Sequence, residues 1–352
     1  MCCDIVGLCI HPHKMHSSVG YGLMKGHICA LAALGILMLM YAESVHSQSV
    51  RVVFWNVENF FDTRNDSLKN DDSFTPAGEN HWNERRFRLK RDNIFKVLVS
   101  LGAPDIVGLA EVENDFVLEQ LCYATPLRKF DYGFIHYDSP DARGIDCAVL
   151  YRRSAFSTFF SKNINISDST ELFFTRDILL VGGVTANNDS LYLLVCHLPS
   201  KLGGDYAERQ RNRIAGLLRH TVDTVANAHP RAAVIVMGDF NADPYEATYQ
   251  KSFGFDGSKT NPEKMTNLMY DLVDGEGSHN YGGRWSYLDQ FMVRPPRAEG
   301  FVMPTAMVYK PEFLLEPDVR HQTSRPFRTY RGLRYIGGYS DHLPVYLDLT
   351  AW

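Results

Sequence analysis

The sequence predicts an α/β fold in which buried strands are mixed with amphipathic helices. Five runs rich in Val, Ile and Leu are continuous rather than alternating, which is typical of strands buried on both faces; they cover residues 51–55, 105–109, 191–196, 233–237 and 285–293. Two segments between them, residues 84–101 and 208–228, carry apolar residues at helical spacing. The composition, with 45% hydrophobic and 22% charged residues, is that of an ordinary globular protein.

The first 47 residues differ in kind from the rest. Residues 28–41 form an apolar run, with Lys25 before it and small residues after it. This run is shorter than the ~20 residues that a membrane span needs, and a basic start with a short apolar core is typical of a secretory signal. We expect residues 1–47 to be an upstream extension plus signal, with translation starting at Met24 and cleavage near Ser47, and the protein to be secreted or periplasmic. An N-terminal membrane anchor is the alternative.

The remaining chain, residues 48–352, has no internal repeat, low-complexity tract or linker, so we expect a single catalytic domain. The full chain has a net charge of −5, which gives little general attraction to nucleic acid. Three cysteines follow the signal, and an odd number argues against a disulfide framework. Cys147 and Cys196 lie in strand-like runs and are predicted to be buried. We expect a monomer, since no long amphipathic surface helix is evident.

The helices and turns follow from local signals. In residues 84–101, Phe87, Ile94 and Leu98 share one face, after Asn83 as a candidate N-cap. The second helix ends before Pro230. Segments 146–160 and 174–194 resemble hairpins, the latter with a turn at residues 187–189.

Polar residues follow the ends of most of these strands. Asn56 and Glu58 come after the first strand, Glu111 after the second, His197 after the third, and Asp239 with Asn241 after the fourth. Ser340-Asp341-His342 precedes a last apolar run. Ligands of α/β sheets gather where strands end. Carboxylates with a histidine at that edge suit metal-assisted hydrolysis of phosphate esters.

Seven short motifs occur in a definite order: FWNVEN at 54–59, LAEVE at 109–113, RGID at 143–146, HLPSK at 197–201, GDFN at 238–241, YLD at 287–289 and SDH at 340–342. Together they resemble the endonuclease/exonuclease/phosphatase superfamily, which includes pancreatic-deoxyribonuclease-like enzymes, and the chain is similar to its secreted bacterial-type members. The resemblance extends over residues 51–349 and implies a four-layered α/β sandwich, with two mixed sheets packed face to face and helices outside.

The resemblance implies a metal site made by Glu58, Glu111 and Asp341, with Glu111 as the principal ligand. Mg²⁺ is the expected ion, since it prefers carboxylate and water oxygens, and Mn²⁺ or Ca²⁺ are alternatives. Asn56 and Glu58 are two residues apart, so in a continuing strand both point to one side; a surface turn is the other interpretation. Glu113 is expected on the solvent face.

The catalytic residues implied by the resemblance are His197, Asp239, Asn241, Asp289 and His342. Asp239 would orient or deprotonate the attacking water, and Asn241 would donate to a phosphate oxygen. His342 needs a fixed tautomer, which a carboxylate on its other ring nitrogen supplies. Asp289 inside an apolar run would be costly without such a partner.

Phosphate or substrate contacts are expected from Asn56, Arg143, Arg176 and Lys201. A plain turn remains an alternative for Arg143, and a solvated charge for Lys201. Two basic regions are further candidates for holding a polyanion, namely the start of the first helix and an arginine-rich, aromatic-rich loop at residues 320–335. The helix is interpreted as a solvated face.

The favoured function is a secreted Mg²⁺-dependent nuclease that hydrolyses phosphodiester bonds. A phosphodiesterase or phosphatase on lipid or small-molecule phosphates is the alternative, and a non-catalytic polyanion-binding module is a remote one. The expected partner is therefore nucleic acid or another phosphodiester.

Overall fold

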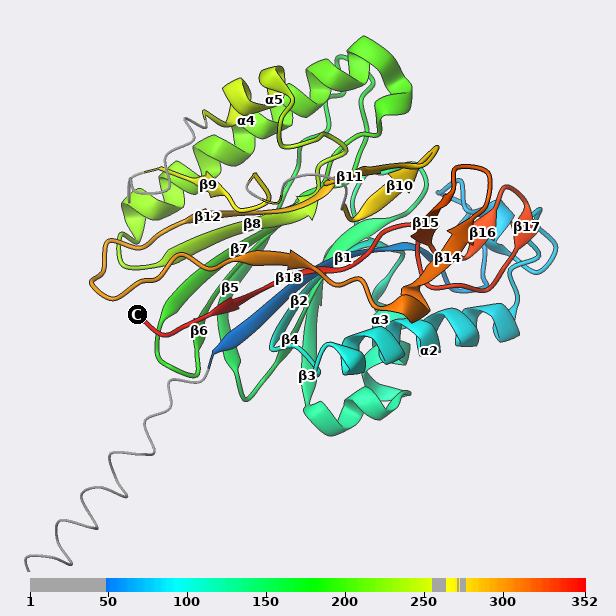
Figure 1. Cartoon of the computed structure of the whole chain (residues 1–352), viewed down its shortest axis with the longest axis horizontal. Coiled ribbons are helices and arrows are strands. Elements are labelled where there is room, and N and C mark those ends of the chain that lie inside the picture. The colour runs from blue at the N-terminus through cyan, green and yellow to red at the C-terminus, as the bar shows by residue number, and fades with distance from the viewer. Residues whose placement is uncertain (1–48, 255–263, 271, 273–276) are drawn as a thin grey trace, which may run out of the picture. The chain divides into compact units, whose positions relative to one another are not determined.

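Two six-stranded sheets pack face to face at the centre of the fold (Figure 1). The first sheet has the order β13-β18-β1-β2-β4-β3, and its strands are β1 (Val50–Phe60), β2 (Ile106–Val112), β3 (Tyr132–His136), β4 (Asp146–Arg152), β13 (Ala306–Val308) and β18 (Val345–Leu349). The second has the order β5-β6-β7-β8-β12-β9, and its strands are β5 (Phe156–Ile164), β6 (Ile178–Thr185), β7 (Ser190–His197), β8 (Ala233–Asp239), β9 (Thr266–Asn267) and β12 (Asp289–Arg294).

This computed structural model describes residues 49–254, 264–270, 272 and 277–352. The expected signal, its start at Met24 and its cleavage near Ser47 lie outside the described residues. Residues Gln48–Trp352 form one compact unit. Within the described ranges, no helix has both the length and the apolar character needed to cross a membrane.

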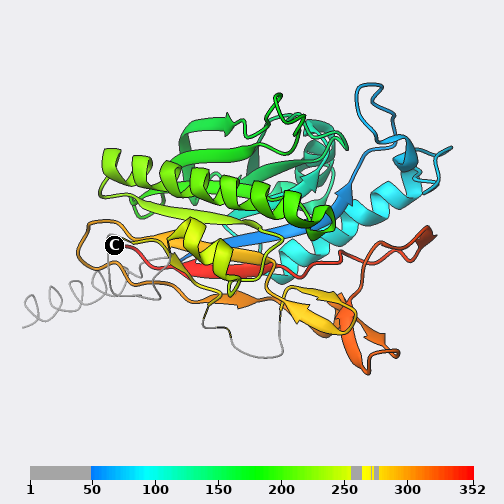
Figure 2. The ribbon, with the colours of Figure 1, turned by 90° about the horizontal axis from the view of Figure 1, so that it is seen from above.

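Three apolar clusters join the layers. One lies between the sheets and includes Phe54, Val149, Leu193 and Phe291. A second joins the outer face of the first sheet to helices α2 (Glu84–Ser100) and α3 (Asp115–Tyr123). A third joins the outer face of the second sheet to α4 (Gly204–Ala228) and α5 (Ala247–Phe253). Figures 1 and 2 show the two helix pairs on opposite sides of the sheets, so the predicted four-layered sandwich is confirmed.

Each sheet contains one parallel pair among antiparallel neighbours. In the first sheet β1 runs parallel to β2, and in the second β7 runs parallel to β8. The strands β4, β12 and β18 are antiparallel to these pairs, so their first residues lie beside the last residues of the parallel strands. The register places Asp289 opposite Asp239 and Asp239 beside His197. One edge of the sandwich therefore collects residues from the ends of both parallel pairs and from the starts of β4, β12 and β18.

Several predicted elements are confirmed and others are wrong. Asn83 caps α2, because its side chain accepts hydrogen bonds from two backbone N–H groups. The helix predicted at residues 208–228 begins earlier, at Gly204. Strands β6 and β7 form the predicted hairpin. The hairpin predicted at residues 146–160 is wrong, because β4 and β5 belong to different sheets. The strand predicted at residues 285–293 is interrupted, so Asp289 begins β12 rather than lying within it.

Three two-stranded ribbons lie beside this edge (Figures 1 and 2). They are β10 (His279–Tyr281) with β11 (Arg284–Ser286), β14 (Leu315–Asp318) with β15 (Thr323–Pro326), and β16 (Tyr330–Arg331) with β17 (Arg334–Tyr335). The last ribbon packs against α2, where the Arg86 guanidinium lies 4.3 Å from the centre of the Tyr335 ring. These ribbons bring residues 279–286 and 315–335 to the strand ends.

Candidate active site

Hydrogen bonds between distant segments fix the strand ends at this edge. Ser340 Oγ donates to the Asn56 carbonyl oxygen at 2.7 Å and accepts the His342 backbone N–H at 3.0 Å. The Trp55 indole donates to the His342 carbonyl oxygen at 2.9 Å. Both Ser340 and Trp55 are buried, so these bonds are shielded from water. The motifs at the two ends of the sequence thus form a single structural unit.

Asp239 lies at the centre of the site and is almost fully buried. Its Oδ1 accepts the Asn241 backbone N–H at 2.9 Å, and its Oδ2 accepts Asn56 Nδ2 at 3.1 Å. Two imidazoles lie nearby, with His197 Nε2 at 3.5 Å and His342 Nε2 at 3.7 Å from Oδ2. Burial raises the pKa of Asp239 to about 7, against the lowering effect of His342. A carboxylate with that pKa is suited to exchange a proton near neutral pH.

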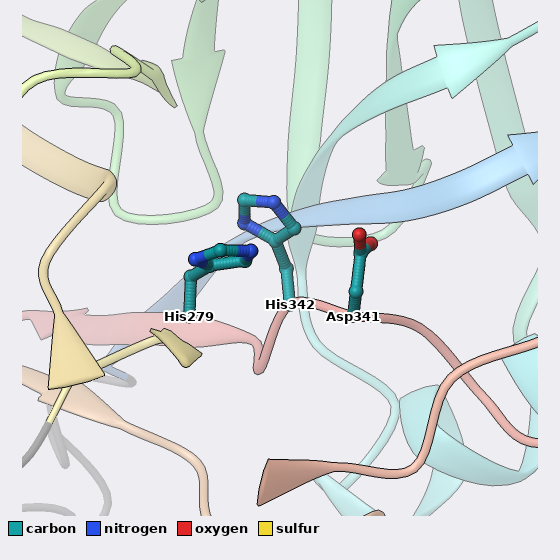
Figure 3. A group of neighbouring side chains, drawn as sticks. All are labelled: His279, Asp341 and His342. Carbon is teal, nitrogen blue, oxygen red and sulfur yellow. The ribbon is translucent and has the colours of Figure 1, made fainter. Parts of the chain in front are cut away.

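His342 is held by Asp289, as the resemblance implied. Its Nδ1 lies 2.7 Å from Asp289 Oδ2, and both side chains are buried. Burial alone would lower the pKa of His342, but Asp289 and Asp239 raise it well above its ordinary value. The imidazole is therefore favoured as a cation with a fixed orientation. Figure 3 shows that His279 stands beside His342, and their ring centres are 4.7 Å apart.

His197 and Asn241 complete this group at the ends of β7 and β8. Burial, together with nearby cations, lowers the pKa of His197 well below its usual range, so the ring is neutral. Its Nδ1 is buried without a hydrogen-bond partner among the described residues. Asn241 has a φ of 47°, and its Nδ2 donates to the Leu198 carbonyl oxygen at 3.0 Å. This bond ties the loop after β8 to the loop after β7.

Glu58 points away from this group, which corrects the expectation that Asn56 and Glu58 line one side. Glu58 and Asn59 have φ angles of 53° and 56°, so the strand bulges and the alternation of side chains is lost. Glu58 Oε1 accepts Arg328 Nε at 3.1 Å, and Oε2 accepts the Thr329 backbone N–H at 2.7 Å. Both oxygens of this predicted metal ligand are thus bound by protein groups.

Arg328 also joins Glu58 to Asp341. Its Nη2 lies 2.9 Å from Asp341 Oδ2 and 3.1 Å from Glu58 Oε1. Burial and Asp341 raise the pKa of Glu58 to about 7, whereas Arg328 lowers the pKa of Asp341 despite its burial. Lys90, predicted on a solvated helix face, is instead buried, and its Nζ donates to Thr329 Oγ1 at 2.7 Å and to the Tyr339 carbonyl oxygen at 2.6 Å. Lys90 therefore anchors the loop that carries Arg328.

Glu111 presents a freer carboxylate. Its φ of 64° makes a bulge in the pairing of β2 with β4, and Oε2 accepts the Asn59 backbone N–H at 2.8 Å. Oε1 faces Arg143 Nη1 at 3.9 Å and has no hydrogen bond to any described residue. Glu113 is buried rather than on the solvent face, because its Oε2 accepts the Asp62 backbone N–H at 2.5 Å, and burial raises its pKa to about 8.

These carboxylates fit a hard divalent cation. Glu111 Oε1 and Asp341 Oδ1 each lack a hydrogen bond within the described ranges, and both residues line one cavity. Mg²⁺ is held by one or two carboxylates plus waters and substrate oxygens, which matches this donor set. Glu111 and Asp341 would hold the ion. Glu58 fits less well, since Arg328 and Thr329 already bind its two oxygens.

The predicted phosphate contacts are only partly brought together. Arg143 lines the cavity with a half-exposed guanidinium. Arg176 also lines it but is buried, with Nη1 3.0 Å from Asp141 Oδ2 and Nη2 donating to the Leu198 carbonyl oxygen. Lys201 lies outside this cavity, and its Nζ pairs with Glu246 at 2.6 Å. Lys201 instead lines the neighbouring pocket.

Two adjoining cavities open at this edge. The first, of about 540 Å³, is lined by Glu111, Asp239, Asp341 and His342 together with Phe174 and Tyr206. The second, of about 800 Å³, is lined by Tyr245, Tyr281, Trp285 and Tyr287, and by Arg284. They share five lining residues, namely Ser200, Leu202, Asn241, His279 and Leu288. The scissile group and the rest of a substrate thus have separate but connected spaces.

The sequence analysis assigned no individual role to two residues of the site, His279 and Arg328. His279 forms a bridge with His342 although it lies in a two-stranded ribbon with no apolar strand signal; only its position ten residues before Asp289 could have drawn attention to it. Arg328 was one of several loop arginines, and its contact with Glu58 spans 270 residues.

Comparisons with known proteins show the family of the chain. The sequence profile of the Endonuclease/Exonuclease/phosphatase family matches residues 51–351. No curated protein sequence matches the chain.

Solved structures share the fold at low sequence identity. TDP2 from D. rerio, complexed with a single-strand DNA product, is 18% identical with a TM-score of 0.53, covering 86% of this chain and 99% of that one. A mannosyl-6-phosphatase from Bacteroides thetaiotaomicron is 17% identical with a TM-score of 0.54, covering 86% and 100%. The human Nocturnin catalytic domain with bound sulfate is 17% identical with a TM-score of 0.52, covering 86% and 94%. Because the family's sequence profile matches nearly all the described residues, the chain belongs to the endonuclease/exonuclease/phosphatase family.

Proposed function

We propose that this protein is an Mg²⁺-dependent nuclease that hydrolyses phosphodiester bonds by attack of water. As a family member it is a hydrolase of phosphate esters. The observation that carries the nuclease proposal is the pair of connected cavities, of which the second is lined by four aromatic side chains and Arg284. Aromatic faces stack on bases and arginine contacts phosphates. A phosphodiester, which continues on both sides of the scissile phosphate, would occupy both spaces.

The chain's own residues can handle the proton and the charge of this reaction. Asp239, held by Asn56 and by the Asn241 backbone, orients a water and accepts its proton as the water oxygen attacks phosphorus. The bond from phosphorus to the ester oxygen on the opposite side breaks, and that oxygen leaves and takes up a proton to become a hydroxyl group. His342, fixed by Asp289, places positive charge beside the phosphoryl oxygens. The neutral His197 is positioned to donate a hydrogen bond to the same group. A divalent cation held by Glu111 and Asp341 would neutralise charge that develops on the phosphoryl oxygens.

Two further points support the proposal. TDP2, which shares the fold, has been seen with a single-strand DNA product. The arginine-rich loop at residues 320–335 borders the site, although Arg325 and Arg331 are paired with Glu316 and Arg328 is paired in the site. We also infer that the protein is secreted or periplasmic and acts as a monomer; the apolar run at residues 28–41 supports the export.

A second candidate, hydrolysis of a lipid phosphate ester, is favoured by the rim of the first cavity. Phe174, Leu202 and Tyr206 are all exposed there, with Leu202 98% exposed. Exposed apolar side chains gathered at a site mark contact with an apolar partner. This rim suits an acyl chain or a membrane surface better than a phosphate backbone.

The test is nicking of supercoiled plasmid by the purified protein with Mg²⁺, beside EDTA and the His342→Ala variant. We expect metal-dependent nicking that the variant loses. If the protein leaves the plasmid intact with every divalent metal but releases headgroups from phospholipid vesicles, the lipid candidate replaces the nuclease. The family assignment would survive either result, since it rests on the profile match.

A further inference from the structure

A second cluster of ligand-type side chains lies at the start of β4, outside the cavities of the active site. His136 ends β3, Asp138 follows it, Asp146 begins β4, and Asp115 begins α3. One ligand atom each from His136, Asp138 and Asp146 lies within 4.8 Å of the others. A pocket of about 440 Å³ opens beside them and is lined by Asp115, His136 and Asp138. Solvent and ions can therefore reach the cluster.

The His136 ring lies between two carboxylates. Nδ1 is 2.9 Å from Asp115 Oδ1, and Nε2 is 3.4 Å from Asp146 Oδ2. The second contact is not a hydrogen bond, and both His136 Nε2 and Asp146 Oδ1 are buried without any hydrogen-bond partner in the described part of the chain. The side chains of His136 and Asp146 are each only 3% exposed. Such buried orphan atoms are uncommon and indicate a missing partner.

A neutral imidazole cannot satisfy this arrangement. Whichever nitrogen carries the proton, the other presents a lone pair to a carboxylate oxygen, which also accepts. The lysine and arginine side chains of the described residues form no ion pair with Asp115, Asp138 or Asp146. Either a proton or a metal cation must therefore lie between His136 Nε2 and the carboxylates.

We propose that His136, Asp138 and Asp146 form a second metal site that binds Zn²⁺. One imidazole nitrogen with two carboxylate oxygens is a donor set that Zn²⁺ accepts, with water completing the shell. Asp115 orients the ring through Nδ1, as carboxylates commonly do behind a metal-binding histidine. The proposal concerns a site separate from Glu111 and does not depend on the nuclease assignment.

The position of the site suggests what the ion does. His136 and Asp146 lie at the two ends of the loop formed by residues 137–145, in which Gly144 adopts a φ of 71°. This loop carries Arg143, which faces Glu111 at 3.9 Å, and Asp141, which holds Arg176 at 3.0 Å. A metal bound to both ends of the loop clamps the segment that presents these groups to the catalytic cavity.

The experiment is equilibrium dialysis of the purified protein against Zn²⁺, with the bound metal counted for each variant. We expect His136→Gln to bind one Zn²⁺ fewer than the wild type. Asp138→Asn, at an exposed ligand, should weaken that ion at least about 10-fold, and Asp115→Asn should weaken it by roughly 10–100-fold through loss of the orienting contact. His229→Gln, at a histidine stacked on Tyr192, should keep the wild-type zinc count.

Circular dichroism of each variant controls for folding. The exposed Asp138 side chain makes no hydrogen bond to another described residue, so Asp138→Asn has none to lose. The proposal is overturned if the wild type and His136→Gln bind the same number of zinc ions, because the occupant between the groups is then a proton. It is equally overturned if His229→Gln loses the ion as well. Because bound zinc is the readout, a failure of the nuclease proposal would leave this result unaffected.

Discussion

The active site has two halves that use carboxylates differently. In the arginine-bridged half, Glu58 and Asp341 are joined by Arg328, and Lys90 anchors the loop behind them. The histidine half contains Asp239, Asp289, His197 and His342. Arginine stays charged at any physiological pH, whereas imidazole can gain or lose a proton. The first half therefore fixes position through a permanent cation, and the second half can transfer protons through its imidazoles.

The predicted metal ligands also differ in how many of their carboxylate oxygens are already bound by protein groups. Glu58 has protein partners on both oxygens, while Glu111 keeps Oε1 without a hydrogen bond among the described residues. An acid whose lone pairs are used by protein donors is a poor ligand, because a metal would have to displace them. The position of an acidic residue at a strand end is therefore not sufficient evidence that it binds a metal.

The largest effect is expected in the histidine half. Asp239→Asn keeps the shape of the side chain but removes the base, so kcat should fall by about 10³-fold, within the usual range for loss of general base catalysis. Plasmid nicking rates would measure this. Asp223→Asn, on the surface of α4 and paired only with Arg219, is the matched control and should leave the rate unchanged. A rate within a few-fold of wild type for Asp239→Asn would remove it from proton transfer.

The two glutamates should differ in metal dependence. Glu111→Gln should raise the half-saturating Mg²⁺ concentration by roughly 100-fold, whereas Glu58→Gln should raise it by less than about 10-fold, since ligands matter more than their neighbours. A titration of activity against Mg²⁺ for both variants makes the comparison. Equal losses in the two variants would show that Glu58 leaves Arg328 and binds the ion.

Stability should depend on the arginine-bridged half. Arg328→Met leaves the buried Glu58 and its neighbour Asp341 without their cation, and we expect the free energy of unfolding to fall by about 2 kcal/mol, less than for a fully buried pair because the guanidinium is partly exposed. Urea denaturation measures this loss. Arg331→Met, whose exposed side chain pairs with Glu316, should change it by less than about 0.5 kcal/mol. If both variants are equally stable, the bridge contributes nothing beyond a surface ion pair.

The pH dependence should report the histidine half. Asp239 must be ionised to accept a proton, and burial raises its pKa to about 7, so kcat/KM should increase as the pH rises through about 7. The Asn56 side chain donates to the ionised form, so Asn56→Ala should move this limb to higher pH by roughly 0.5–1 unit, the equivalent of one hydrogen bond. Profiles of kcat/KM against pH provide the measurement, and a shift to lower pH would contradict the assigned contact.

Lys201 should have the smallest effect. It pairs with Glu246 at the margin of the second cavity, and both side chains are partly exposed. Lys201→Ala should therefore change kcat by less than about 3-fold, as expected for an exposed ion pair. Arg143→Ala, at the catalytic cavity, is the informative comparison and should cost more. A larger loss for Lys201→Ala than for Arg143→Ala would place the scissile phosphate nearer the second cavity.

The sequence predicted the fold class and the edge at which the site lies, because continuous apolar runs specify buried strands and polar motifs follow their ends. The antiparallel placement of β12 and β18 then brought Asp289 and Asp341 to the same edge as Asp239. The expected alternation of side chains failed at Glu58. Glu58 and Glu111 both have a positive φ, which no local pattern of these residue types indicates.

By itself, therefore, the sequence determined which residue types end the strands and which of them share an edge. Only the tertiary structure decided which carboxylates are neutralised and which remain available. Arg328 reaches Glu58 across 270 positions of the chain, and Lys90 holds the same loop from a helix that the sequence suggested was solvated on that face. The physical reason is that desolvation and pairing are set by neighbours brought together in folding, and these fix the charge of a buried carboxylate.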